Sequence, residues 1–236
     1  MTKGNRTSIH VQSWADLWQR SIDTCELERP PKRQKITVPK FQIDNVVSTF
    51  KFNLQLNLAM LAQKVFFLEY NCAKFTAATV RLMEPRTTAL TFPSGSVVCT
   101  GAKSVEDSKR AAIYYADIFR RVDARLCIEK EAQIQNIVAS AKTGFTIKLM
   151  EIAERFGVRT SFEMNVFPGL VFRFDDPQIV FLVFRSGSVV ITGANSTSTI
   201  ARIFARFYEH ILLPFRDDGE HAHVTNSAEY KKILER

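Results

Sequence analysis

The chain of 236 residues lacks the features that would indicate a membrane protein or a familiar enzyme. No run approaches the ~18 consecutive apolar residues of a membrane span, and the N-terminus has no apolar core of a secretory signal. The GxGxxG, P-loop and HExxH patterns and the nucleophile elbow are all missing. We therefore expect a protein that is not an enzyme, is not secreted and has no membrane partner.

Cysteine and histidine are too few and too scattered for a metal centre. The four cysteines form no CxxC pair, which favours reduced thiols in the cytosol or nucleus. His221 and His223 lie close together in the sequence, but no cysteine or third ligand is near them. We expect neither a metal nor another cofactor.

The composition is that of a folded, basic protein. Apolar residues make up 46% of the chain and charged residues 24%, which excludes disorder of the whole chain. The net charge of +8 favours an acidic partner such as nucleic acid or an anionic membrane surface. A soluble basic protein without such a partner would have the same composition, so charge alone leaves both interpretations open.

The chain contains one long motif twice. Phe92–Ser104 reads FPSGSVVCTGAKS, and Phe184–Ser196 reads FRSGSVVITGANS. Extended without a gap, Phe75–Ser104 and Phe167–Ser196 share 14 of 30 residues. An upstream match, DNVVS against QNIVA, follows in the same order. A repeat of about 90 residues has the length of a small domain, so we expect two copies of one fold about a pseudo-two-fold axis.

Each copy has the same expected order of elements: a strand, a short helix, three strands in hairpins and a longer helix. In the first copy they are expected at 42–49, 56–66, 75–82, 88–92, 97–100 and from Ser104 onward; in the second, at 134–140, 147–156, 170–174, 179–184, 189–192 and 199–212. Asp107, three residues after Ser104, suits a capping box at the start of the first long helix.

This order predicts an α+β fold in which helices cover one face of each repeat's antiparallel sheet, and the sheets of the two pseudo-symmetric repeats can join into one. The expected organisation is an N-terminal extension at 1–40, repeats at 41–128 and 129–216, and a polar tail at 217–236.

Alternation along the strands places an unusual set of side chains on the uncovered face. The set combines asparagine and threonine with valine and leucine, and phenylalanine lies near its ends. A covered core would exclude the asparagines, and a solvated face would exclude the large apolar residues. The DNA minor groove, by contrast, offers acceptors at A·T pairs beside apolar sugar edges. Phenylalanine can wedge between base steps, and Arg81 and Arg173 can reach phosphates.

The segments EPRTTALTFPSG and VVCTGAKS, and then VFPGLVFRF, PQIVFLVFRSG and VVITGA, closely resemble the two repeats of the TATA-box-binding protein family. The resemblance covers about 38–216. It implies one curved antiparallel sheet formed by the two pseudo-symmetric repeats, a saddle with helices on its convex face, and it implies a general transcription initiation factor. Such a factor binds and bends A/T-rich promoter DNA through the minor groove, as a monomer on DNA, and nucleates assembly of the preinitiation complex. Carried over position by position, the implied DNA-binding residues are Asn45, Val47, Phe75, Arg81, Leu90, Phe92, Ser94, Val98, Thr100, Lys103, Asn136, Val138, Phe167, Arg173, Leu182, Phe184, Ser186, Val190 and Thr192.

The positions that the family uses for protein partners match less well. Glu163 matches one of two glutamates that help to bind transcription factor IIB, which predicts a IIB-like partner. In the first long helix only Tyr115 and the following alanine match a basic KYAR-like stretch used by transcription factor IIA, so Tyr115 is the residue expected to contact a partner there. Either a IIA-like protein does not bind, or that partner has diverged as well. Ser96 and Ser188 stand where the family usually has lysine, so a shallower salt dependence is expected.

This divergence fits a paralogue or a copy encoded by a large DNA virus. The expected location is the nucleus, or a cytoplasmic viral factory if the gene is viral. Two other functions stay open: a DNA-bending protein of relaxed sequence preference, and an adaptor of the same fold that acts mainly through protein partners.

The N-terminal extension carries the only two tryptophans, Trp14 and Trp18. Their spacing of four predicts a helical apolar stripe that docks a partner or the protein's own concave face. A helix packed on the core, or a tail with incidental tryptophans, has the same pattern. The basic stretch at 29–35 is compatible with a nuclear-import signal, a phosphate contact or a solvated linker.

Overall fold

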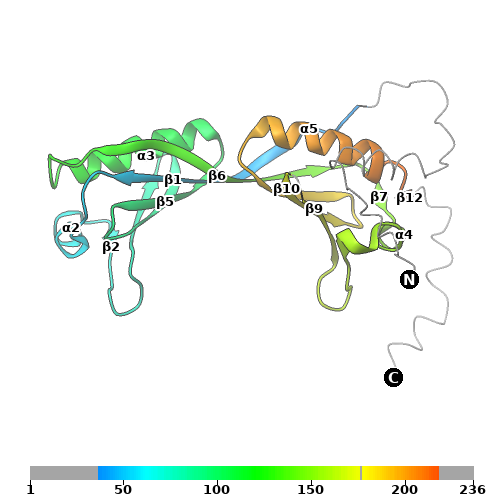
Figure 1. Ribbon diagram of the computed structural model, residues 1–236, viewed down its shortest axis with the longest axis horizontal. Helices are drawn as coiled ribbons and strands as arrows, with labels where there is room; N and C mark the ends of the chain where they lie inside the picture. The colour runs from blue at the N-terminus through cyan, green and yellow to red at the C-terminus, as the bar shows by residue number, and fades with distance from the viewer. Residues whose placement is uncertain (1–36, 176, 218–236) are drawn as a thin grey trace, which may run out of the picture. The chain divides into compact units, whose positions relative to one another are not determined.

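Ten strands join into one antiparallel sheet in the order β2-β3-β4-β5-β1-β6-β11-β10-β9-β8 (Figure 1). The structure is a computed structural model that describes residues 37–175 and 177–217. The sheet is centred on its two longest strands, β1 (Phe41–Phe52) and β6 (Ile128–Lys142). Phe41 pairs with Ala141 and Phe52 with Ile128, so the two strands run side by side over nearly their full lengths. The sheet therefore continues without a break from one repeat into the other.

The same elements are built twice, once on each side of this central pair. The first half contains α2 (Leu58–Lys64), β2 (Leu68–Glu69), β3 (Ala78–Met83), β4 (Arg86–Thr91), β5 (Ser96–Ala102) and α3 (Val105–Arg120). The second half contains α4 (Leu149–Phe156), β8 (Thr160–Ser161), β9 (Gly169–Asp175), β10 (Gln178–Phe184), β11 (Ser188–Ala194) and α5 (Thr197–Phe207), after which a π-helical turn covers Tyr208–Leu212. The expected saddle of two pseudo-symmetric repeats is confirmed.

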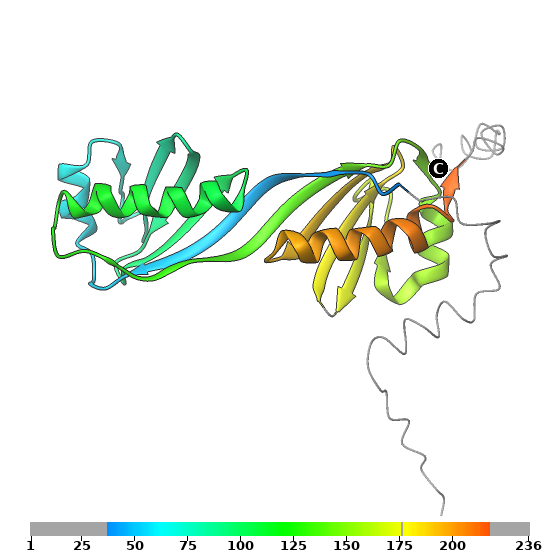
Figure 2. The same cartoon turned by 90° about the horizontal axis from the view of Figure 1, so that it is seen from above.

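The two long helices lie on the same face of the sheet, one over each half (Figures 1 and 2). Both begin at a serine whose hydroxyl accepts a hydrogen bond from a backbone N–H three residues on: Ser104 from Asp107, and Ser196 from Thr199. The predicted start of α3 is confirmed. The helix α5 begins two residues before the expected position, because Ser196 and not a later residue is its cap. No helix in the described ranges is long and apolar enough to span a membrane.

Two-residue strands at the margins were not expected from the sequence. They are β2, β8, and the separate pair β7 (Thr146–Ile147) and β12 (Arg216–Asp217). A two-residue strand is too short to carry a periodic pattern. β2 and β8 form beside the longer strands β3 and β9, and β7 and β12 pair only with each other. The pairing of β12 with β7 also gives Asp217, the first residue of the expected polar tail, a place in a strand.

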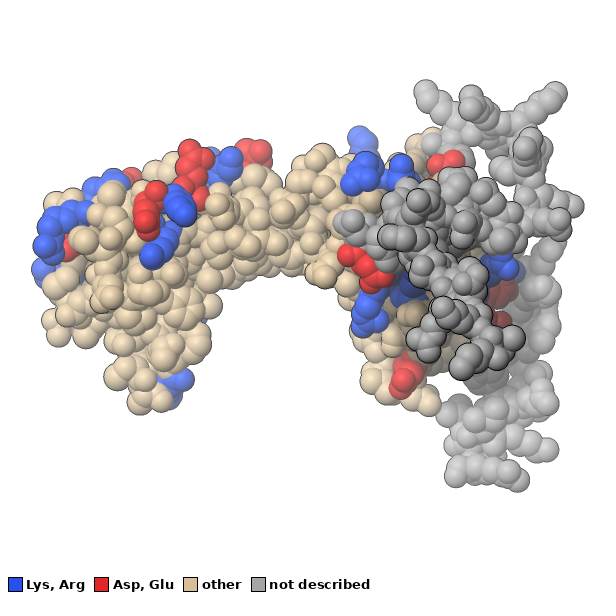
Figure 3. Space-filling model, viewed as in Figure 1, with Lys and Arg blue, Asp and Glu red and all other residues tan. Residues whose placement is uncertain are grey.

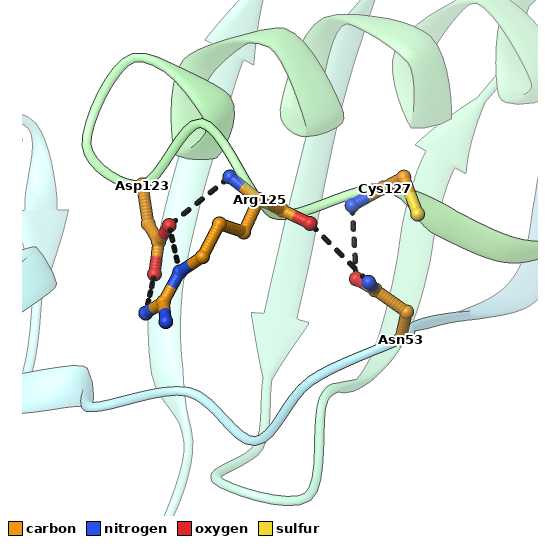
Figure 4. Close-up of polar contacts among 4 residues, drawn as sticks. All are labelled: Asn53, Asp123, Arg125 and Cys127. Atoms are coloured by element: carbon orange, nitrogen blue, oxygen red, sulfur yellow. Dashed lines mark hydrogen bonds and ion pairs between the residues drawn. The ribbon is translucent and has the colours of Figure 1, made fainter.

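The connection from α3 to β6 is fixed to the end of β1 by one asparagine (Figure 4). The Asn53 side chain donates to the Arg125 carbonyl at 3.2 Å and accepts from the Cys127 N–H at 2.9 Å. Asp123 holds the Arg125 guanidinium at 2.8 Å, and this contact lowers the pKa of the Asp123 carboxyl to about 2. These contacts fix the conformation of the segment that connects α3 of the first repeat to β6 of the second.

Candidate nucleic-acid interface

The sheet face opposite α3 and α5, called the open face here, has no covering layer among the described residues. Along β1 the side chains of Val46, Ser48 and Phe50 are buried, whereas those of Asn45, Val47 and Thr49 are only partly so. The same alternation runs through β4, β5, β10 and β11. Leu90, Val98, Leu182 and Val190, which we expected on this face, are all half-buried. The open face is thus accessible and largely apolar.

Strand register aligns these residues in two matching rows. In the first half, Thr79 lies opposite Leu90, Leu90 opposite Val98, and Val98 opposite Thr49. In the second half the corresponding row is Val171, Leu182, Val190 and Ser140. Neighbouring strands are about 4.8 Å apart. Each row is therefore a continuous apolar ridge, and both ridges end at the central strands.

The centre of the open face is formed by two asparagine–valine pairs. Asn45 lies opposite Val138, and Val47 lies opposite Asn136. All four residues are half-buried. The expected set of central residues is therefore brought together across β1 and β6, at the point where the two repeats meet.

Each central asparagine has its amide orientation fixed by a backbone donor. Asn45 Oδ1 accepts from the Gly101 N–H at 2.7 Å, and Asn136 Oδ1 accepts from the Gly193 N–H at 2.8 Å. Since a backbone N–H can only donate, the oxygen must occupy that position and the NH₂ group must occupy the other. The Nδ2 atoms lie 3.2 and 3.1 Å from the hydroxyls of Thr100 and Thr192. Each amide therefore offers its second N–H to whatever lies on the open face.

Two glycines make this geometry possible, and the sequence analysis did not single them out. Gly101 and Gly193 have φ values of +101° and +102°, a region that side chains rarely adopt. A Cβ at Gly193 would lie 2.2 Å from the Gln178 carbonyl oxygen. Both glycines sit where the strand register shifts, a bulge that turns their N–H groups toward the asparagines. The TGA triplet that occurs in both repeats is the signal that could have identified them.

Paired phenylalanines stand at the outer part of each half. Phe75 and Phe92 have ring centroids 6.4 Å apart, and Phe167 and Phe184 have theirs 5.7 Å apart, both edge to face. Phe75 is 49% exposed and Phe167 is 36% exposed. Because solvent-exposed rings gain little from packing in the free protein, these pairs are available to enter an apolar partner.

The second phenylalanine pair is packed more closely because a glycine lies beneath it. A Cβ at Gly169 would lie 2.7 Å from Phe167 Cε1 and 3.0 Å from Phe184 Cε1. The first repeat has Ala77 at the corresponding position, 92 residues earlier. Where the first repeat has the Ala77 methyl group, the two phenylalanine rings lie further apart than in the second repeat.

The cations and serines expected to reach phosphates are exposed around the apolar ridges. Arg81 and Arg173 lie on the open face, opposite Thr88 and Val180. Lys103 donates to the Asp44 carbonyl at 2.6 Å. The hydroxyls of Ser94 and Ser186 donate to those of Ser96 and Ser188, at 3.1 and 3.2 Å. In Figure 3 the visible hollow between the two halves is lined by uncharged residues, and charged groups gather above it over α3.

The residues expected to bind protein partners differ in their exposure to solvent. Tyr115 is fully buried, and its hydroxyl lies 3.0 Å from that of Thr87, so its predicted role as a partner contact is wrong. It faces the core because it belongs to the apolar stripe of α3, whereas the neighbouring Tyr114 is 44% exposed. Glu163 is exposed in the loop before Phe167. Trp14 and Trp18 lie outside the described residues.

Comparison with known proteins places this geometry in a family. The family described as "Transcription factor TFIID (or TATA-binding protein, TBP)" matches residues 40–122 and 131–212. TATA-box-binding protein 1 of Triticum aestivum is 43% identical over 174 residues, which are 74% of this chain and 74% of that protein. The TATA-box-binding protein of Methanothermobacter thermautotrophicus is 44% identical over 156 residues, 66% of this chain and 85% of that protein.

A more divergent relative and a solved structure agree. TATA-box-binding protein-like 1 of Entamoeba histolytica is 35% identical over 201 residues, 85% of this chain and 88% of that protein. The solved structure of Methanococcus jannaschii TBP has a TM-score of 0.64 and 38% sequence identity, and the match covers 72% of this chain and 97% of that one. The chain therefore belongs to the TATA-binding protein family.

Proposed function

We propose that the chain is a general transcription initiation factor that binds A/T-rich promoter DNA by its minor groove, bends it, and nucleates assembly of the preinitiation complex. The observation that carries the proposal is the pair of locked asparagine amides at the centre of the open face. Adenine N3 and thymine O2 are the only groups that A·T pairs present in the minor groove, and both are acceptors. Two fixed donors with flanking valines are complementary to that surface.

The phenylalanine pairs supply the means of bending. A ring inserted between two base steps unstacks them and kinks the duplex toward the major groove. One pair at the outer part of each half would place a kink at each end of the contacted site. The apolar ridges between them would then follow the widened groove.

The remaining contacts of the chain would be with DNA phosphates and with protein partners. Arg81, Arg173 and Lys103 would position the duplex without reading its sequence. Exposed Glu163 is suited to a IIB-like protein that approaches the second half. Such a factor acts where promoters are transcribed, in a nucleus or, for a viral gene, in a viral factory. On DNA the chain would act as a monomer, since one chain contains both half-interfaces.

A binding and bending assay tests this function. The full chain should bind and bend an A/T-rich duplex far more tightly than a shuffled G·C-rich duplex of equal length. Replacing Phe92 and Phe184 by alanine should abolish bending, while Ile113→Ala, an exposed apolar residue on α3 on the opposite side of the sheet, should leave it intact. Equal affinity for both duplexes would favour the relaxed-specificity alternative. No binding to either duplex would contradict the proposal and favour an adaptor.

A further inference from the structure

Two cations on the open face of the first half are already paired with carboxylates. Arg81 Nη1 lies 2.6 Å from Glu69 Oε1, and Lys51 Nζ lies 3.7 Å from Glu129 Oε2. Arg81 belongs to the open face because the alternating residue Val80 is buried, and Lys51 because Phe50 and Phe52 are. Glu69 lies opposite half-buried Thr79, at the edge of the same face.

The corresponding cations of the second half have no such partners. Arg173 stands 92 residues after Arg81, and register puts Ser161 in the place of Glu69: Ser161 lies opposite Val171 as Glu69 lies opposite Thr79. Within the described ranges Arg173 makes no ion pair, even with Asp175 on the same strand.

Lys142 on β6 differs from Lys51 on β1 in the same way as Arg173 differs from Arg81. It lies opposite Ser188, as Lys51 lies opposite Ser96. Together with a second cation, Lys40, it lines a shallow depression, and neither lysine has an ion-pair partner in the part of the chain that the structure describes. These two positions show the same difference between the halves. At two further positions the first half has the additional cation: Arg86 corresponds to Gln178, and Lys103, which donates to the Asp44 carbonyl, corresponds to Asn195.

A carboxylate next to a cation competes with a DNA phosphate for the same hydrogens. The Arg81 guanidinium holds the pKa of the Glu69 carboxyl below its ordinary value, so this carboxylate is charged at neutral pH. A phosphate that approaches Arg81 must displace Glu69 or accept its repulsion. Arg173 and Lys142 can instead bind phosphates directly and release the counterions that surround them.

We propose that Glu69 and Glu129 weaken the phosphate contacts of the first half, so that the second half is the electrostatic anchor and sets the direction in which the protein sits on a symmetric A/T site. This proposal rests on the proposed function, because it requires DNA on the open face. Glu69 and Glu129 would influence the direction of binding through the cations that they contact, and not through contacts with bases.

Salt titration tests the competition at each residue. For Glu69→Gln we expect severalfold tighter binding to an A/T-rich duplex and a salt slope steeper by about one, the value for one gained phosphate contact. Ser161→Glu should have the opposite effect. Glu106→Gln, an exposed residue on α3, makes the same charge change on the far side and should leave the slope unchanged. A slope for Glu69→Gln equal to that for Glu106→Gln would overturn the competition.

A direction assay tests the consequence. The probe is a duplex with a palindromic A/T core between two different flanking sequences, with neutral methylphosphonates at one end of the core and a fluorophore at the other end of the duplex. A second fluorophore on exposed Cys72 marks the first half, with Cys25 and Cys127 replaced by serine. We expect the first half at the neutral end in most complexes, and a clearly smaller preference after the exchange Glu69→Ser with Ser161→Glu, which leaves the Lys51–Glu129 pair in place. Tight binding with equal populations in the unexchanged protein would overturn this proposal alone. Absence of any complex would overturn the proposed function with it.

Discussion

The two halves of the sheet have matching side chains on the open face but different side chains in the cores beneath it. On the open face, asparagine, threonine, valine, leucine and phenylalanine recur at corresponding positions of the two repeats. In the core of the first half the buried residues include Ser48, Thr87, Thr91 and Cys99 on the strands and Ser108 on α3. At the corresponding positions under α5 they are Ala139, Ile179, Val183, Ile191 and Ile200, all fully buried.

The first core combines packed phenylalanines, such as Phe52 and Phe119, with small side chains and buried hydrogen bonds. Ser108 donates to Ser48 at 2.7 Å, and the hydroxyls of Thr87 and Tyr115 lie 3.0 Å apart. Thr91 Oγ1 is buried without a hydrogen-bond partner. Buried polar pairs of this kind contribute about 1 kcal/mol each, and an unpartnered hydroxyl is a cost.

The second core is held by aromatic packing. Phe181 and Phe207 are stacked with ring centroids 4.0 Å apart, and Phe172 lies 5.2 Å from Phe207. The first half has Ala89 where the second has Phe181. The same open face is therefore compatible with two different cores. What the core must do is hold the strands in the same register.

Among the variants that test the difference between the two cores, Phe181→Ala should have the largest effect on stability. Truncating a fully buried phenylalanine costs about 3–5 kcal/mol, because the cavity cannot collapse fully. We expect the free energy of unfolding, measured by urea titration, to fall by that amount. Ala89→Gly at the corresponding first-half position should cost much less. A loss below about 1 kcal/mol for Phe181→Ala would mean that the second core is not closely packed.

The next effect is on pH dependence. Its larger part should arise in the first half, although burial also raises the pKa of the Tyr208 hydroxyl in the second half. Burial raises the pKa of the Cys99 thiol to about 11 and that of the Tyr115 hydroxyl to about 12. In the unfolded chain these groups ionise near pH 9.0 and 10.0. Their contribution to stability is therefore complete below pH 9 and is lost as pH rises from about 9 to 12. Two pKa units correspond to at most about 3 kcal/mol for each group.

Unfolding measured between pH 8 and 12 checks this expectation. The corresponding second-half residues are Ile191 and Phe207, which do not ionise. The double variant Cys99→Val with Tyr115→Phe should flatten the alkaline loss of stability. Cys127→Ser changes an exposed thiol and should not. An unchanged alkaline slope in the double variant would place the titrating groups elsewhere.

The smallest expected effect tests the symmetry of the open face. Asn45→Ala and Asn136→Ala each remove one fixed donor, which should cost about 1–3 kcal/mol in discrimination of A/T-rich over G·C-containing sites. The two losses should agree within about threefold in the ratio of dissociation constants, since the two amides have the same contacts. A loss confined to one variant would show that the open face reads DNA with one half only.

Much of the fold was predictable because its signals are local and occur twice. Alternation in β4, β5, β10 and β11 predicted both the strands and the side that faces the core. The serine cap of α3 was equally visible, whereas the Ser196 cap of α5 was not recognised and this helix was expected two residues too late. The marginal strands were not predictable, because two-residue segments such as β2 pair only through a neighbour that the local sequence does not specify.

The candidate site divides in the same way. The sequence by itself determined which residues share the open face, because period-two alternation fixes the side of a strand on which each residue lies. It also indicated the family through the two repeats. Tyr115 shows the limit: a motif match marked it as a surface residue, whereas the apolar stripe of α3 buries it.

Only the tertiary structure decided how those residues are held. The Asn45 amide is oriented by Gly101, 56 positions away, and Arg81 is neutralised by Glu69 only because β2 joins the edge of the sheet. Both contacts form between segments that are distant in sequence or lack a pattern of their own. Their geometry follows from strand register, which depends on bulges and on the packing of the whole sheet.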